Sequence, residues 1–342
     1  MTVRLAPTTL ACMLTRRRFL IGASGAVVVG ATARLRPQLG GGRKTLLPFS
    51  PQAAVAQGSG FYSVVAPGIG ADGFYPEVRL SQTTPFQGGA ILVTATNAAS
   101  GRARVFGREY VLEPGDEGIA GFVGFGTEDP PGYTDLTVHL VDQLGEPLNY
   151  GYGITVRATQ WTFDDIIIPP APPPDPNAPP PPPPPPNEQP RLNELYATVT
   201  PRRWAGPWII PILLGGDVFI SGYFGEERSF NGGPRGGHHG GTDIAAPHAT
   251  EVQATNRGIV VFAEEGLIRG NCVVIDHGAG ILSSYGHMSA LRVTVGDEVE
   301  RGKVIGLVGS TGLSTGPHLH WELSVGGVLV DGLRWLDGTQ GF

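Results

Sequence analysis

The stretch Gly316-Pro317-His318-Leu319-His320-Trp321-Glu322-Leu323 alternates between polar and apolar side chains from His318 onward. This is the period of a β-strand, so both imidazoles project from one face while the leucines and the tryptophan project from the other. Two histidines at this spacing can serve one site, although such pairs also occur on solvated strands. The stretch therefore predicts a β-sheet that displays histidines on one of its faces.

The composition extends that prediction to the rest of the chain. Glycine and proline account for 52 and 32 of the 342 residues. Apolar runs at helical spacing are few, so we predict an all-β fold rich in turns. The length is enough for two domains of ordinary size and their connections, and no stretch is long and apolar enough to form a stable membrane span in the mature chain.

Two further motifs lie upstream of that strand, in the part of the chain where histidines concentrate. Seven of the eight histidines lie between residues 238 and 320. A catalytic zinc site takes three protein ligands from histidine and carboxylate and keeps one position for water. In His239-Gly240-Gly241-Thr242-Asp243, the glycines allow a tight path between two such ligands, and His320 would complete the set. The other motif, Tyr285-Gly286-His287, offers a further imidazole at the end of a strand.

With these motifs in place, the segment from about residue 224 to residue 336 resembles the lysostaphin/LytM-type zinc metallopeptidases, which cleave peptidoglycan cross-bridges. The matching stretches, in order and spacing, are residues 224–228, 239–247, 285–287 and 316–320. The resemblance implies a compact, mostly antiparallel β-sheet domain of barrel-sandwich type with a groove over the sheet. It also implies that zinc is held by His239, Asp243 and His320, and that His287 and His318 are catalytic.

The chemistry of these residues agrees with that division of roles. Zinc bound by two neutral imidazoles and one carboxylate keeps a net positive charge, lowers the pKa of its water and polarises a carbonyl. Peptide hydrolysis also needs a base near that water and a donor for the oxyanion or the leaving amine. No HExxH motif is present, so His287 and His318 are the available proton-active groups. Their spacing does not decide which one is the base.

Five other residues have secondary interpretations. Glu322 shares a face with the histidine pair and is either an orienting residue behind a ligand or an unrelated side chain. We expect His238 to be a bystander, His248 a surface residue, and His277 structural or solvated. Cys272 lies within an apolar run, which indicates a buried structural thiol.

Composition also divides the chain into segments. Residues 57–168 contain short strand-like runs separated by turns, which predicts a small β-sandwich of immunoglobulin-like type. Residues 169–190 are almost pure proline, which is typical of a polyproline II linker or, alternatively, of a ligand for a proline-recognising domain. Residues 191–342 form the predicted zinc peptidase domain.

The N-terminal segment, residues 1–56, resembles a twin-arginine export signal. Thr15-Arg16-Arg17-Arg18-Phe19-Leu20 fits the consensus, a Gly/Ala-rich apolar run follows it, and cleavage after Ala33 or Ala56 would fit. The segment holds eight basic residues and no acid, so its removal changes the formal charge from −6 to 16 basic against 30 acidic residues, or −14. Such a protein is a poor candidate for binding nucleic acid.

Together these features predict an exported, monomeric zinc metalloendopeptidase of the periplasm, cell envelope or medium that hydrolyses peptide bonds in peptidoglycan stems or cross-links. The alternative is a catalytically inactive wall-binding regulator of another cell-wall hydrolase. Degenerate relatives of that kind typically lack zinc ligands, whereas all five family positions are filled here.

A second alternative is a lipoyl-type carrier domain. Such a carrier needs a lysine at an exposed hairpin tip, and Lys303, the only lysine after Lys44, is not placed at one.

Overall fold

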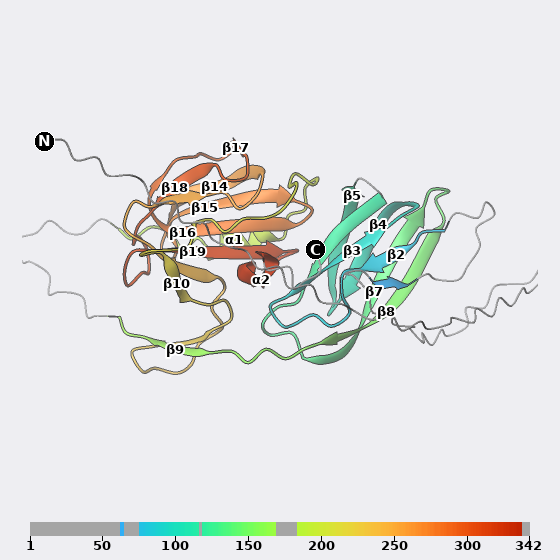
Figure 1. Ribbon diagram of the computed structural model, residues 1–342, viewed down its shortest axis with the longest axis horizontal. Coiled ribbons are helices and arrows are strands. Elements are labelled where there is room, and N and C mark those ends of the chain that lie inside the picture. The colour runs from blue at the N-terminus through green and yellow to red at the C-terminus, as the bar shows by residue number, and fades with distance from the viewer. Residues whose placement is uncertain (1–61, 65–74, 116–117, 169–182, 337–342) are drawn as a thin grey trace, which may run out of the picture. The chain divides into compact units, whose positions relative to one another are not determined.

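The computed structural model describes residues 62–64, 75–115, 118–168 and 183–336 (Figure 1). Most of the regular structure in these ranges is β-strand, which confirms the predicted all-β fold class. The predicted export signal, residues 1–56, lies outside the described residues. Among the described residues, no helix combines the length and the apolarity that crossing a bilayer requires.

The first sheet contains eight antiparallel strands in the spatial order β1-β2-β3-β6-β5-β4-β7-β8. Burial alternates along them: in β7, Leu136, Val138 and Leu140 are buried and the residues between them are not. The immunoglobulin-like type expected for residues 57–168 stays a prediction. The strands are β1 (Tyr62–Val64), β2 (Val78–Leu80), β3 (Ala90–Ala95), β4 (Ala98–Val105), β5 (Arg108–Gly115), β6 (Gly118–Gly124), β7 (Gly132–Asp142) and β8 (Pro147–Val156).

The second sheet has ten antiparallel strands and confirms the antiparallel sheet predicted for the C-terminal part. Its main path is β10-β12-β19-β16-β15-β14-β17, while β18 pairs with β13 and β16, and β20 pairs with β19. The strands are β10 (Phe219–Gly222), β12 (Thr242–Ala245), β13 (Glu251–Gln253), β14 (Gly258–Gly266), β15 (Gly270–Gly278), β16 (Ile281–Leu291), β17 (Glu298–Val299), β18 (Val304–Val308), β19 (His318–Val325) and β20 (Val328–Val330).

This second sheet buries side chains on both of its faces. Val273 of β15, with Leu319 and Trp321 of β19, belongs to a cluster of apolar side chains on one face. Residues that alternate with these project from the other face, as in any strand. His318 and His320 are therefore displayed opposite Trp321, as the alternation of the sequence predicted.

Helix α1 (Gln189–Tyr196) begins inside the segment predicted as a linker, residues 169–190. Pro190 lies in its first turn, where a helix does not need the missing N–H. Leu192 and Tyr196, four residues apart, are buried together with side chains of the second sheet, namely Phe262, Cys272, Val274 and Leu282. The sequence analysis missed this helix because it has only two buried side chains and follows directly on a proline run.

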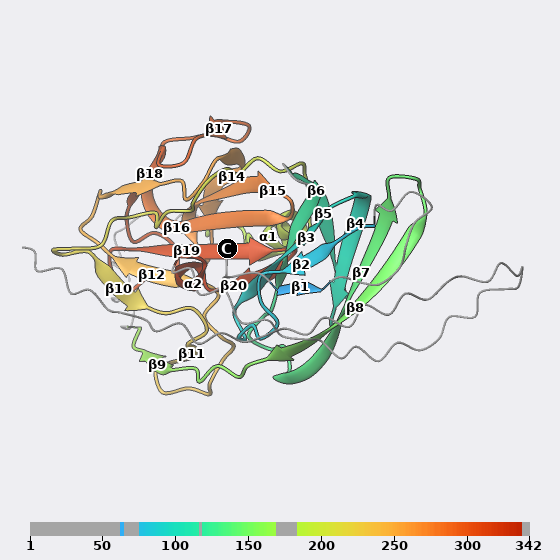
Figure 2. The ribbon, with the colours of Figure 1, turned by 45° about the vertical axis from the view of Figure 1, so that its right-hand side comes forward.

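Strand β9 (Phe163–Ile166) does not join the first sheet but pairs in parallel with β11 (Glu227–Phe230) (Figure 2). Asp165 supports this pairing, because its carboxylate accepts hydrogen bonds from the Ser229 hydroxyl at 2.5 Å and from the Gly232 amide at 3.0 Å. Residues on the N-terminal side of the proline run therefore bind directly to the part of the chain predicted to be the peptidase.

The apolar core also continues from one sheet to the other. Phe122 of β6 lies 4.7 Å, between ring centroids, from Trp335 of α2 (Gly332–Leu336). Gly124 of β6 lies so close to Val325 and Val328 that a Cβ at Gly124 would be 3.2–3.3 Å from their atoms. Packing is thus continuous where two separate domains were expected, and the boundaries of the predicted segments stay a prediction.

Candidate metal and catalytic centre

Neighbouring strands of the second sheet bring four of the five candidate residues together. Asp243 of β12 is paired directly with His320 of β19, and His318 lies two residues earlier on the same strand. Gly286 of β16 is paired with His320 from the other side, which places His287 beside the same spot. His239 reaches it from the loop before β12. The histidines and the aspartate that were singled out in the sequence therefore lie in one place.

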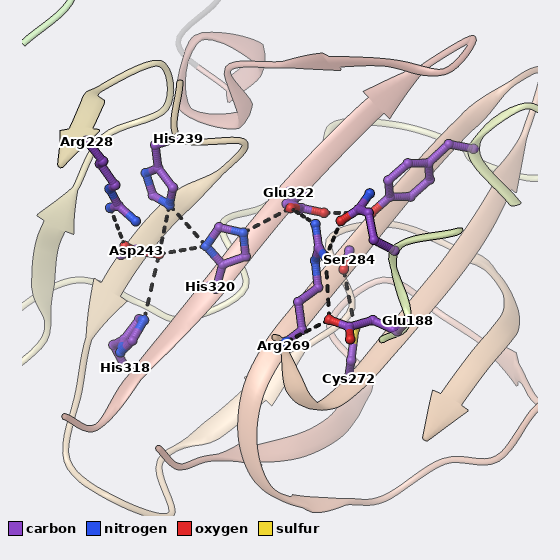
Figure 3. Close-up of polar contacts among 12 residues, drawn as sticks. Glu188, Arg228, His239, Asp243, Arg269, Cys272, Ser284, His318, His320 and Glu322 are labelled. Carbon is purple, nitrogen blue, oxygen red and sulfur yellow. Dashed lines mark hydrogen bonds and ion pairs between the residues drawn. The ribbon is translucent and has the colours of Figure 1, made fainter. Parts of the chain in front are cut away.

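Three potential ligand atoms converge at this spot (Figure 3). His320 Nδ1 lies 2.7 Å from Asp243 Oδ1 and 3.1 Å from His239 Nε2. His239 Nε2 lies 3.2 Å from Asp243 Oδ1. All three residues are buried, with 5–9% of their surface exposed. Ligands of a tetrahedral zinc ion, bound at about 2.05 Å, would lie roughly 3.3 Å apart. The three atoms are therefore spaced like three corners of a zinc coordination shell.

The opposite side of each of these residues is held by a second contact. His239 Nδ1 donates to the Tyr223 carbonyl at 2.8 Å. Arg228 Nη2 donates to the other oxygen of Asp243 at 2.6 Å. His320 Nε2 donates to Glu322 Oε1 at 3.0 Å, which supports the orienting interpretation of Glu322. Such partners fix the tautomer and the direction of metal-binding side chains.

The donor set requires a positive charge. With each imidazole proton committed to a carbonyl or carboxylate on the far side, both ring nitrogens that face Asp243 carry lone pairs. Three acceptor atoms at 2.7–3.2 Å repel one another unless a proton or a cation lies between them. Two histidines and one carboxylate with this spacing are a donor set that suits Zn²⁺. His239, Asp243 and His320 thus fit a zinc ion.

The formal charges around the histidines also indicate that the centre needs a cation. Six ionisable side chains near the centre are at most 17% exposed: Arg228, Arg269, Glu188, Glu226, Asp243 and Glu322. Two cations against four carboxylates leave two negative charges. Buried charges need compensation nearby, and one divalent cation supplies that amount.

The two remaining histidines are also anchored through Nδ1. His287 Nδ1 donates to the Thr311 carbonyl and His318 Nδ1 to the Gly316 carbonyl, both at 2.8 Å. Their rings lie 4.6 Å apart, and His318 Nε2 is 3.8 Å from Asp243 Oδ1. In each imidazole Nε2 is therefore the ring nitrogen without the proton, and that of His318 faces Asp243.

The backbone at His287 is in a strained conformation. Its φ is +62°, a region that residues other than glycine rarely adopt. The His287 amide donates to the Arg269 carbonyl at 2.6 Å, which helps to hold that conformation. Strain of this kind is concentrated at functional sites, where the surroundings impose it.

The electrostatic surroundings shift the pKa values of His287 and His320 in opposite directions. Burial, together with the nearby His320 and His318, lowers the pKa of His287 to about 3, so its imidazole is neutral at pH 7. Burial also disfavours protonation of His320, but hydrogen bonds to Asp243 and Glu322 outweigh it and raise its pKa to about 9. Burial would raise the pKa of Asp243, yet hydrogen bonds from His239 and His320 hold it well below its usual range. The three-residue centre thus attracts positive charge.

A pocket of about 500 Å³ opens over these residues. Its lining includes all four site histidines and Ile166 of β9, and Ile168 just beyond that strand. Asp243 also lines this pocket, and β9 contributes to its wall.

Among the described residues, neither the remaining histidines nor the cysteine contributes one of the three convergent atoms. His238 Nδ1 donates to the Gly225 carbonyl at 2.7 Å, and His248 is exposed. His277 is buried and hydrogen-bonded to the Arg257 carbonyl, so it is structural and not solvated. Cys272 is buried, as expected.

Sequence reasoning missed two residues of this centre. Arg228 lies in one of the matching stretches but carried no assigned role, although it binds Asp243. Arg269 lies in the β14–β15 turn, and no motif marked it. Only its spatial contact with Glu322, at 2.5 Å, reveals it.

Residues 237–332 match Peptidase family M23. Peptidoglycan DD-endopeptidase ShyA of Vibrio cholerae is 42% identical over 115 residues, which are 34% of this chain and 27% of that protein. DD-carboxypeptidase/endopeptidase Mpg of Neisseria meningitidis is 46% identical over 93 residues, which are 27% of this chain and 21% of that protein. The chain thus covers about a quarter of the length of each relative.

A solved structure from Pseudomonas aeruginosa, described as a peptidase M23, is similar over a longer range. The similarity covers 74% of this chain and 95% of that chain, with a TM-score of 0.54 and 23% sequence identity. At this identity the similarity concerns the fold. It extends beyond the second sheet, since residues 191–342 make up less than half of the chain.

Proposed function

We propose that this protein, whose residues 237–332 form a domain of peptidase family M23, is a zinc metalloendopeptidase that hydrolyses peptide bonds in peptidoglycan stems or cross-links. The observation that carries the proposal is the convergence of His239 Nε2, Asp243 Oδ1 and His320 Nδ1 with two further imidazoles beside them. The substrate class is taken from the names of two relatives. ShyA is named as a peptidoglycan DD-endopeptidase and Mpg as a DD-carboxypeptidase/endopeptidase.

His239, Asp243 and His320 would hold the metal. When bound, zinc would lower the pKa of a water molecule and polarise the scissile carbonyl. Arg228 and Glu322 keep Asp243 and His320 directed at the same point. The ligand roles thus fall to residues whose side chains are fixed from behind, so little reorganisation is needed when substrate arrives.

His287 and His318 would carry the protons. Because each donates from Nδ1 to a carbonyl, each presents a lone pair on Nε2. Either can accept the proton of the attacking water, and the resulting imidazolium can return it to the leaving amine. The other imidazole is then available to interact with the oxyanion. The burial of His287 keeps its imidazole neutral at pH 7, so its Nε2 lone pair is available.

The cellular setting belongs to the same proposal. The twin-arginine motif at Arg16-Arg17 supports export to the periplasm, cell envelope or medium, where peptidoglycan is accessible. The acidic balance of the chain argues against nucleic acid as a partner. We take the protein to act as a monomer, with no partner chain needed to complete the site.

The test is incubation of the purified full chain with peptidoglycan, followed by mass spectrometry of the released muropeptides. We expect cross-linked muropeptides to be cleaved, cleavage to stop on addition of a chelator, and zinc to restore it. His320→Ala should be inactive, whereas His248→Ala, which changes an exposed histidine outside the centre, should match the parent. Absence of chelator-sensitive cleavage, or a fully active His320→Ala variant, would refute the proposal and favour a regulator of another wall hydrolase.

A further inference from the structure

Glu322 is joined to three side chains at once. Its Oε1 accepts hydrogen bonds from His320 Nε2 at 3.0 Å and from Arg269 Nη2 at 2.5 Å. Its Oε2 accepts the hydroxyl of Tyr196 at 2.6 Å. The carboxylate is only 2% exposed. A buried carboxylate with both oxygens engaged has one orientation, so the direction of the His320 ring depends on Arg269 and Tyr196.

Arg269 is itself held by the residues around the start of α1. Glu188 accepts the backbone N–H of Arg269 at 2.7 Å and lies 3.6 Å from its guanidinium. Gln189 Oε1 accepts Arg269 Nη1 at 2.8 Å. Figure 3 shows Glu188, Arg269 and Glu322 in one continuous row that ends at His320. The guanidinium therefore lies between the carboxylate of Glu188, directly before α1, and that of Glu322, which contacts a candidate metal ligand.

Arg269 also contacts His287, one of the two candidate catalytic histidines, through its backbone. The carbonyl of Arg269 accepts the amide of His287, the residue with φ +62°. Arg269 thus contacts the partner of a metal ligand with its side chain and a candidate catalytic histidine with its main chain. A change in the position of Arg269 would therefore alter the positions of both Glu322 and His287.

We propose that Arg269, Glu188 and Tyr196 are positioning residues, which fix Glu322 and thereby His320 so that α1 completes the metal centre. The proposal rests on the assignment of His320 as a metal ligand in the proposed function. Glu188 and Tyr196 precede residues 237–332, the range that matches the peptidase family. The packing of Leu192 and Tyr196 against the sheet supplies the rigid base that this arrangement needs.

Metal affinity tests this role without relying on peptidase activity. Tyr196→Phe removes one hydroxyl and keeps the packing of the ring. Tyr110→Phe is the matched control, because Tyr110 is also buried and donates its hydroxyl to one acceptor, the Gly124 carbonyl, far from the histidines in sequence. For each full-length variant we would measure zinc affinity by competition with a chromophoric chelator, the visible spectrum of the Co²⁺ form, and the melting temperature.

We expect Tyr196→Phe to bind zinc about tenfold more weakly than the parent and to change the Co²⁺ spectrum, with Tyr110→Phe unchanged in both. Arg269→Lys, which retains the positive charge, should lie between the parent and Arg269→Met. Equal zinc affinity and equal Co²⁺ spectra for the parent and Tyr196→Phe would overturn the positioning role and leave the proposed function standing. A parent chain that binds no zinc would overturn both.

Discussion

Asp243 and His320 are paired residues on neighbouring antiparallel strands, and Asp243 Oδ1 lies 2.7 Å from His320 Nδ1. Their closeness depends on the register of β12 against β19. A slip of one residue would turn the Asp243 side chain to the opposite face and present Ile244 in its place. The metal centre is therefore encoded in strand pairing as much as in the side chains themselves.

Loss of the Arg228 guanidinium, which binds Asp243, should weaken zinc binding at the centre. Arg228→Gln removes the 2.6 Å contact to Asp243 Oδ2 and leaves a buried carboxylate less well oriented. We expect zinc affinity to fall by about 10- to 100-fold. Arg235→Gln is the control, since Arg235 pairs with Glu227 at the surface and its side chain is 63% exposed. Similar zinc affinities in the two variants would show that Arg228 has no special role.

Removal of either histidine proposed to carry protons should lower the cleavage rate without changing the zinc affinity. We expect His287→Ala and His318→Ala each to lower the rate of muropeptide cleavage by about 10²- to 10⁴-fold. Zinc affinity should stay near the parent value, because neither residue contributes one of the three convergent atoms. If one variant cleaved at the parental rate, that histidine would have no part in proton transfer.

Buried His277 should make the fold sensitive to acid. Burial lowers its pKa from 6.5 to about 4 in the folded chain. Between these values the unfolded chain binds more protons, so stability is full above pH 6.5 and falls as the pH drops toward 4. His277 alone would lower the free energy of unfolding by about 2 kcal/mol at pH 5 relative to pH 7.

The measurement is urea unfolding at both pH values. His277→Gln should lose less stability than the parent between pH 7 and pH 5, whereas the exposed His248→Gln variant should lose as much as the parent. Parallel losses in all three chains would exclude His277 as the source.

The contact of β9 with the peptidase part can be weakened by one methyl group. A Cβ at Gly225 would overlap the ring of Trp161, and Gly225 has φ +82°. Gly232 also has positive φ, +70°, but no atom lies near the position of its Cβ. Gly232→Ala should therefore cost only the backbone strain, about 1–2 kcal/mol.

We expect Gly225→Ala to cost more than Gly232→Ala and to increase hydrogen–deuterium exchange in residues 161–166. Equal costs and unchanged exchange in both variants would mean that Trp161 does not hold β9 in place.

The candidate centre was predictable from the sequence where its residues lie on regular strands or within one short motif. The alternation around His318 and His320 fixes their common face, and five residues from His239 to Asp243 carry two ligand types. Glu322 was assigned to that face by the same alternation, but its role depended on what lies behind it.

Contacts between distant segments were not predictable. Arg269 meets Glu322 across 53 positions of sequence, and Asp165 meets Ser229 across 64. Neither pair belongs to a periodic pattern, because one partner lies in a turn or in an isolated short strand. Helix α1 escaped notice for a similar reason, since its significance comes from Leu192 and Tyr196 packing on a sheet that forms much later in the chain.

The two flanks of the proline run are bound to the same half of the molecule. On one side, the Ile168 amide donates to Asn231 at 2.8 Å. On the other, the Pro186 carbonyl accepts the amide of Leu267 at 3.0 Å. A tether between two bodies has one end on each, whereas both flanks of this run are bound to the part of the chain that holds the candidate centre. The two flanks are therefore held on one part of the chain whatever the length of the run between them, and inserting further prolines should leave both flanks and the candidate centre in place.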